Sequence, residues 1–164
     1  MNQQCINVLF LSSANSTRSI MAEAILKRMG GARFRAYSAG SHPTGRVNPL
    51  ALEQLKLRGY VTEGLASKSW NAFTAGDAPS LGLLIGVCGK VVKERHPAWP
   101  GTPVNLYWNL RSPNMVQGSD AEVRAVFSSV CGQLEAAMGE LVDLRLDQLD
   151  AETALSRLQH IGPR

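Results

Sequence analysis

The stretch CINVLFLSSANSTRSIMAEA, residues 5–24, decides the fold that we expect for this chain. Its first part, 5–11, is a short and largely apolar run rich in β-forming side chains, which is typical of a buried strand in a parallel sheet. A polar loop follows, and Ser19 then opens a helix expected over 20–29, which ends at a pair of glycines. A buried strand, a tight loop and a helix in direct succession predict the start of an α/β domain.

The rest of the chain repeats this alternation of strand-like and helix-like segments. Further strands are expected over 33–40, 81–88 and 104–108. Helices are expected over 49–58, 67–73, 120–147 and 150–160, and in the long one apolar side chains recur every three or four residues. The proline content of 90–103 predicts a loop, and so does the composition of 109–119. The segments together predict an α/β fold with a parallel sheet, in which the loops after Leu11, Cys88 and Trp108 gather at one edge.

Length and composition exclude several classes of protein. The 164 residues, 45% hydrophobic and 18% charged, suit a single globular domain over 1–164. The net charge of +4 is mild and the basic residues are scattered, so we expect no nucleic-acid partner. We see no signal-peptide pattern and no apolar run of the roughly 20 residues needed to cross a membrane. Three cysteines without a framework spacing argue against a disulfide scaffold, and we expect a cytoplasmic protein.

The polar loop between residue 12 and Arg18 has the features of an anion cradle. Backbone N–H groups of a tight turn that enters a helix face inward, and the helix N-terminus adds partial positive charge. Arg18 supplies a planar fork for two oxygens, and Asn15 tolerates a left-handed conformation that ties the loop together. The expected anion-binding residues are Ser13, Ala14, Asn15, Ser16, Thr17, Arg18 and Ser19. The spacing S-x5-R-S alone leaves open an ordinary βα turn with a solvated Arg18.

A family resemblance narrows this choice. VLFLSSANSTRSIMAEAIL resembles the opening of the low-molecular-weight protein tyrosine phosphatase superfamily, in particular its arsenate reductase branch, whose pattern is V-L-F-x-C-x-x-N-x-x-R-S-x-M-A-E-A. The similarity continues through FRAYSAGSHP, NPLALEQLKLRGY, VCG and HPAWPG. It implies a three-layer α/β/α fold around a mostly four-stranded parallel sheet, as in phosphotyrosine phosphatase I. It also implies a small oxyanion or phospho-ligand such as phosphate, sulfate or arsenate, which the residue at Arg18 binds, with no cofactor.

The chain departs from the family pattern at its catalytic positions. Ser12 stands where the family has its nucleophilic cysteine, and a hydroxyl is far less acidic than a thiol in the same cradle. Ser112, before Pro113, stands where the family has its general-acid aspartate, and losing such an acid costs about 10²–10⁴ in rate. Of the two further cysteines that arsenate reduction needs, Cys88 matches one in VCG, and His96 resembles the position of the other.

Several residues keep two interpretations. Cys88 is either a redox remnant or a buried thiol packed as a small hydrophobe, and Cys131 is expected in the core. We expect no metal, because Cys88 and His96 are only two candidate ligands and structural zinc takes four. Trp99 and Trp108 could form a pocket wall or could anchor loops as core aromatics. The basic residues beside the pocket, which could attract an acidic partner, are Lys90, Lys93, Arg95 and Arg111.

Three departures at one site favour natural degeneration over an engineered substrate trap. The sequence therefore predicts a pseudoenzyme: a catalytically impaired relative of arsenate reductases and tyrosine phosphatases that retains oxyanion binding at 12–19. One alternative is an active enzyme of the same family, which would need a base beside Ser12 or a role for Cys88. The other is a protein-interaction module whose pocket is vestigial.

Overall fold

The computed structural model describes residues 5–163 and has a four-stranded parallel sheet at its centre. The strands are β1 (Ile6–Ser12), β2 (Phe34–Gly40), β3 (Leu83–Gly86) and β4 (Val104–Tyr107), in the order β2-β1-β3-β4. All three strand pairs are parallel. The predicted α/β class and the four-stranded sheet are confirmed, and β3 and β4 are shorter than the segments 81–88 and 104–108 that predicted them.

The helices are α1 (Arg18–Met29), α2 (Pro49–Leu57), α3 (Gly89–Lys93), α4 (Asp120–Asp143) and α5 (Ala151–Leu158). Short 3-10 turns are η1 (Gly31–Arg33), η2 (Trp70–Phe73), η3 (Pro113–Met115) and η4 (Leu146–Gln148). Between residues 5 and 163, none of these helices has the length and apolar character that a membrane span requires.

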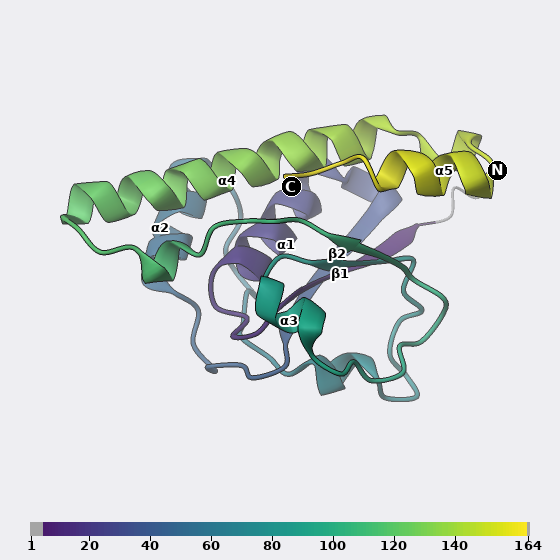
Figure 1. Cartoon of the computed structure of the whole chain (residues 1–164), viewed down its shortest axis with the longest axis horizontal. Coiled ribbons are helices and arrows are strands. Elements are labelled where there is room, and N and C mark those ends of the chain that lie inside the picture. Colours follow the sequence, from purple (N-terminus) through teal and green to yellow (C-terminus); the bar gives the residue numbers. More distant parts are fainter. Residues whose placement is uncertain (1–4, 164) are drawn as a thin grey trace.

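The sheet separates two apolar clusters, because successive side chains of a strand point to opposite faces. On one face, Phe10 and Ile85 belong to the larger core, which α1 and α4 cover. On the other face, Leu9 and Leu11 pack with Val91 of α3 and Phe73 of η2. Figure 1 shows α4 running along the first face and α3 with its neighbouring loops below the sheet. This arrangement confirms the three-layer α/β/α expectation.

Three predicted segments differ from the structure. Residues 90–103 are not entirely loop, because α3 occupies Gly89–Lys93 and the prolines come only after it. The long helix ends at Asp143 and not at 147, because Arg145 takes a left-handed conformation (φ 50°) that an α-helix cannot include. Leu144 and Leu146 still pack against the core, which explains why the apolar periodicity continues past the last helical turn. The segment 67–73 contains only the 3-10 turn η2.

Candidate functional site

The carboxyl ends of the strands bring three loops together, as the parallel sheet predicted. The Val87 amide donates to the Leu11 carbonyl, and the Trp108 amide donates to the Gly86 carbonyl, both at 2.9 Å. From the first turn of α1, Arg18 reaches the third loop, where its Nη1 donates to the Leu110 carbonyl at 3.0 Å. The loop that joins β1 to α1 therefore lies beside the loops that follow β3 and β4.

The carbonyl groups of this loop face away from its centre. The carbonyls of Ser13, Ala14 and Ser16 accept from the amides of His42 (2.8 Å), Thr44 (3.1 Å) and Asn48 (2.9 Å). A trans peptide points its N–H opposite to its C=O, so the amides that follow these carbonyls face the inside of the loop. Of these amides, that of Asn15 donates to Ser12 Oγ, and within residues 5–163 those of Ala14 and Thr17 donate to no protein acceptor. The loop thus presents inward N–H groups to its concave side, as an anion nest does.

Asn15 holds the loop in this shape. It has a φ of 47°, the left-handed conformation anticipated from the sequence, and its side chain is completely buried. Its amide donates to Ser12 Oγ at 3.0 Å, and its Nδ2 donates to Ser19 Oγ at 2.9 Å. Its Oδ1 accepts from the Lys68 amide at 2.8 Å. One side chain therefore connects the floor of the loop, the first turn of α1 and a distant segment.

Ser12 lies at the floor of the loop, where its hydroxyl is bonded to two neutral groups. Its Oγ is 2.6 Å from Ser19 Oγ and accepts from the Asn15 amide. The imidazole of His42 bonds Ser41 Oγ through Nδ1, and that of His96 bonds the Val91 carbonyl through Nε2. Over the described part of the chain, no imidazole and no carboxylate forms a hydrogen bond with Ser12.

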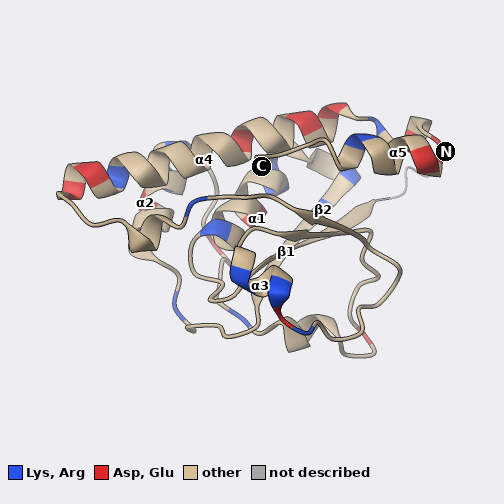
Figure 2. Ribbon diagram, viewed as in Figure 1, with Lys and Arg blue, Asp and Glu red and all other residues tan. Residues whose placement is uncertain are grey.

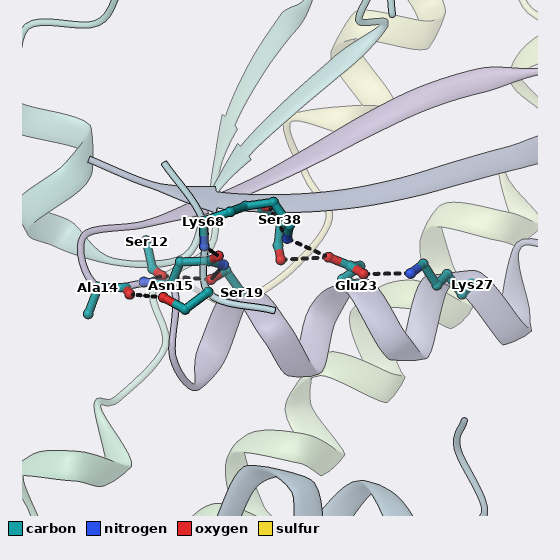
Figure 3. A network of polar contacts seen from close by, with 9 residues as sticks. Ser12, Ala14, Asn15, Ser19, Glu23, Lys27, Ser38 and Lys68 are labelled. Atoms are coloured by element: carbon teal, nitrogen blue, oxygen red, sulfur yellow. Dashed lines mark hydrogen bonds and ion pairs between the residues drawn. The ribbon is translucent and has the colours of Figure 1, made fainter. Parts of the chain in front are cut away.

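A buried ionic network supports the loop from behind (Figure 3). Glu23 of α1 is only 4% exposed, and its carboxylate accepts from Ser38 Oγ and Lys27 Nζ, both at 2.6 Å. Lys68 Nζ lies 3.6 Å from Glu23 Oε1 and donates to the Ser38 carbonyl at 2.9 Å. Burial lowers the pKa of Lys68, and the carboxylate of Glu23 opposes that shift. The sequence prediction missed this network entirely.

The loop after β4 covers the start of α1. Asn114 in η3 accepts through Oδ1 from Thr17 Oγ1 and from Asn48 Nδ2, each at 3.0 Å. Ser112 precedes η3, and its side chain makes no capping hydrogen bond. The structure thus brings Ser12, Arg18 and the Ser112 loop to one site. Asn48 and Asn114 were also missed from the sequence.

Cys88 lies against the anion loop and not in a purely apolar pocket. Burial raises the pKa of its thiol, but the amides of Val91, Ser13 and Lys90 and the charge of Arg18 outweigh burial and leave the pKa below its ordinary value. Cys131 is fully buried in the main core, as expected, and burial raises its pKa to about 11. The two buried thiols therefore occupy opposite electrostatic environments.

The two tryptophans from the pocket loops lie on opposite faces of the sheet. Trp108 is completely buried in the main core beside Phe10, with ring centroids 6.0 Å apart. Trp99 packs with Trp70 and His96 beside a cavity of about 380 Å³ on the other face. Both act as anchors in the packing, and neither forms a wall of the anion loop.

Charge is distributed unevenly over the molecule. Figure 2 shows basic residues at the start of α1, on α3 and in the adjoining loops, whereas acidic residues gather along α4 and around the start of α5. The edge with the anion loop is therefore the more basic one, which favours the approach of anions. Among residues 5–163, no three His, Cys, Asp or Glu side chains are close enough to hold a metal ion.

Comparison with known proteins identifies the family. The family described as low molecular weight phosphotyrosine protein phosphatase matches residues 7–155. An arsenate reductase of Halalkalibacterium halodurans is 31% identical over 123 residues, 75% of this chain and 85% of that protein. A glutaredoxin arsenate reductase of Synechocystis is 29% identical over 135 residues, 82% of this chain and 95% of that protein. A solved structure described as an arsenate reductase in the phosphate binding state superposes with a TM-score of 0.68 at 27% identity, over 84% of this chain and 97% of that one. The chain thus belongs to the low molecular weight phosphotyrosine protein phosphatase family, and arsenate reductases are among its relatives.

Proposed function

We propose that this member of the family binds a small oxyanion, phosphate or arsenate, in the loop 12–19 and is impaired in covalent catalysis. The inward amides of the loop, the N-terminus of α1 and Arg18 supply the donors and the positive charge. A related arsenate reductase has been solved in a phosphate binding state, which supports the same ligand class here.

The observation that carries the impairment is the surroundings of Ser12 Oγ. A serine acts as a nucleophile when an adjacent general base takes its proton. Here Oγ meets the Ser19 hydroxyl and the Asn15 amide, and neither group can act as a base. Because a hydroxyl is far less acidic than a thiol, the two hydrogen bonds do not compensate for the missing base.

The second support is the residue at the general-acid position. Ser112 has no proton acidic enough to give to a leaving oxygen at neutral pH. In phosphate monoester hydrolysis, the expected loss from this position alone is about 10²–10⁴ in rate. The two losses together predict an oxyanion-binding protein with little or no turnover.

Calorimetric titration with phosphate, sulfate and arsenate tests the binding part. Replacing Arg18 by alanine removes a charge-assisted contact worth about 1.5–3 kcal/mol, so Kd should rise roughly 10- to 150-fold. Arg35→Ala is the matched control, because Arg35 is an exposed arginine of β2 outside the site, and it should leave Kd unchanged. If millimolar ligand gives no heat of binding with either wild type or Arg18→Ala, the proposal of oxyanion binding is wrong.

Restoring the family residues tests the impairment. Ser12→Cys alone should give feeble hydrolysis of p-nitrophenyl phosphate, and adding Ser112→Asp should raise it. Substantial hydrolysis by the wild type that disappears in Ser12→Ala would show that the hydroxyl is an active nucleophile. An inactive double variant would indicate that the loop itself has lost its function.

One observation favours a second candidate, a thiol-dependent reductase that uses Cys88. This thiol has a lowered pKa and lies within the influence of Arg18 and the Ser13 amide. Thiol-dependent arsenate reduction that survives Ser12→Ala and is lost in Cys88→Ala would establish this function. Without such activity, the binding function stands alone.

A further inference from the structure

We propose that residues 158–163, which we call the C-terminal strap, are a positioning element of the oxyanion site. The strap lies beyond residue 155, where the match to the family ends. It holds the loop 108–115 in the conformation that receives Arg18. Its effect on ligand affinity rests on the proposed oxyanion binding, whereas its effect on the loop does not.

The strap is anchored in the main core. After α5 the chain turns back (Figure 1), and residues of this segment line one cavity with the C-terminal part of α4. Leu158 is 3% exposed and Ile161 is 7% exposed, and both belong to the cluster that contains Trp108 and Leu110. The start of the loop after β4 and the strap therefore share one apolar environment.

The backbone of Gly162 lies directly against the indole of Trp108. A Cβ at this position would overlap Trp108 Cδ1 and would lie 2.5 Å from Nε1 and 2.8 Å from Cγ. Gly162 also has a φ of +90°, a conformation that other residues rarely adopt. Only glycine satisfies both conditions, so the contact fixes the strap relative to Trp108.

A hydrogen bond fixes the next residue of the loop. The Asn109 amide donates to the Pro163 carbonyl at 2.9 Å. On its other side, Trp108 is tied to the sheet, because its amide donates to Gly86. The strap therefore determines the path of the chain just where it leaves β4.

This path leads directly to the anion loop. Leu110 follows Asn109, and its carbonyl accepts from Arg18 Nη1. Four residues further on, Asn114 accepts from Thr17 Oγ1. Asn109, which bonds the strap, is directly followed by Leu110, which bonds Arg18. A displacement of the strap therefore displaces the Leu110 carbonyl, and with it the guanidinium of Arg18 that is expected to bind the ligand. Leu158 and Gly162 thus act on the site through the loop and are not binding residues.

Gly162→Ala tests the proposal, with Gly64→Ala as its matched control. Gly64 has a similar φ of +81°, but a Cβ there would meet nothing within 4 Å. Both variants therefore carry the same backbone strain, and only Gly162→Ala displaces the strap from Trp108. Hydrogen–deuterium exchange of the amides at 109–116 should accelerate at least about tenfold in Gly162→Ala and remain unchanged in Gly64→Ala. The Kd for phosphate should rise about tenfold in Gly162→Ala alone.

Unchanged exchange at 109–116 in Gly162→Ala would overturn the proposal. Faster exchange with an unchanged phosphate Kd would overturn the link between strap and site. If the wild type does not bind phosphate, the proposed function fails, and the exchange result alone supports or overturns the strap. Should Gly162→Ala not fold, Ile161→Ala weakens the same anchor without backbone strain, and the same exchange criterion applies.

Discussion

Replacing Asn15 by alanine should strongly destabilise the protein. The left-handed conformation at φ 47° costs an alanine about 1–2 kcal/mol. The Lys68 amide loses its acceptor, at a cost of about 1–3 kcal/mol. Ser19 Oγ loses the hydrogen bond from Asn15 Nδ2 but keeps the one with Ser12 Oγ, so the loss of this contact should cost about 1 kcal/mol. The expected loss of unfolding free energy is about 3–6 kcal/mol, a large part of the 5–15 kcal/mol typical of domains.

Asn15→Gly separates the two causes of this loss. Glycine adopts a positive φ without the steric cost, so it should be about 1 kcal/mol more stable than Asn15→Ala although it lacks the same side-chain bonds. Urea unfolding followed by tryptophan fluorescence measures both variants. Asn71→Ala is the control, because Asn71 is exposed and its change should stay within about 0.5 kcal/mol of wild type. The reasoning is refuted if Asn15→Ala lies within 1 kcal/mol of wild type, or if glycine is no better than alanine.

Three more outcomes follow from the described contacts. Iodoacetamide at pH 8 should alkylate Cys88 before Cys131, because the pKa of Cys88 is lowered and that of Cys131 is raised to about 11. Peptide mass spectrometry measures the two alkylation rates, and equal rates would contradict this prediction. Lys68→Met should cost about 1–3 kcal/mol at pH 7, a range kept low because the side chain is 31% exposed. Folding lowers the pKa of Lys68 below 10.5, so between the folded and the unfolded pKa the unfolded chain binds more protons than the folded chain. The unfolding free energy of wild type should therefore rise relative to that of Lys68→Met as pH increases through this interval. Parallel plots of unfolding free energy against pH for the two proteins would contradict this. Arg145→Gly should raise the free energy of unfolding by about 0.5–1 kcal/mol, because glycine adopts the left-handed conformation without steric cost. Thermal unfolding measures this, and a lower stability of the variant would show that Arg145 is not strained.

The predictable parts of this fold were those encoded by neighbouring residues. The strand, polar loop and helix of 5–24 form one continuous pattern, and the left-handed Asn15 follows from the tolerance of asparagine for that conformation. The parallel sheet then dictates that the loops after Leu11, Cys88 and Trp108 meet at one edge. Local pattern and sheet topology were sufficient for these features.

The missed contacts join segments that are distant in the sequence. Glu23 is a charged residue of α1, and it is buried where it contacts Ser38 and Lys68, 15 and 45 positions away. Asn114 contacts Thr17, which lies 97 positions away in the sequence. No single stretch of sequence carries information about such pairs.

The short helix α3 was missed for a local reason, because the prolines that begin at Pro97 dominated the composition of the segment 90–103.

The surroundings of Ser12 explain how a loop can lose its chemistry and keep its shape. Ser12 Oγ accepts from the Asn15 amide, Ser19 Oγ accepts from Asn15 Nδ2, and either hydroxyl can donate in the bond between the two serines. An anion at residue 12 has no proton to give, so the Ser19 hydroxyl would then donate to it beside the Asn15 amide. Two such donors to a charged sulfur would lower the pKa of a thiol at this position, yet they are insufficient to ionise a hydroxyl. The thiol introduced by Ser12→Cys should therefore titrate clearly below the value of about 8.5 usual for cysteine. The ultraviolet absorbance of the thiolate, taken as the difference between variant and wild type across pH, measures this pKa. A titration at or above 8.5 would mean that these donors do not stabilise an anion at residue 12, and the argument for a preserved anion loop would lose its electrostatic basis.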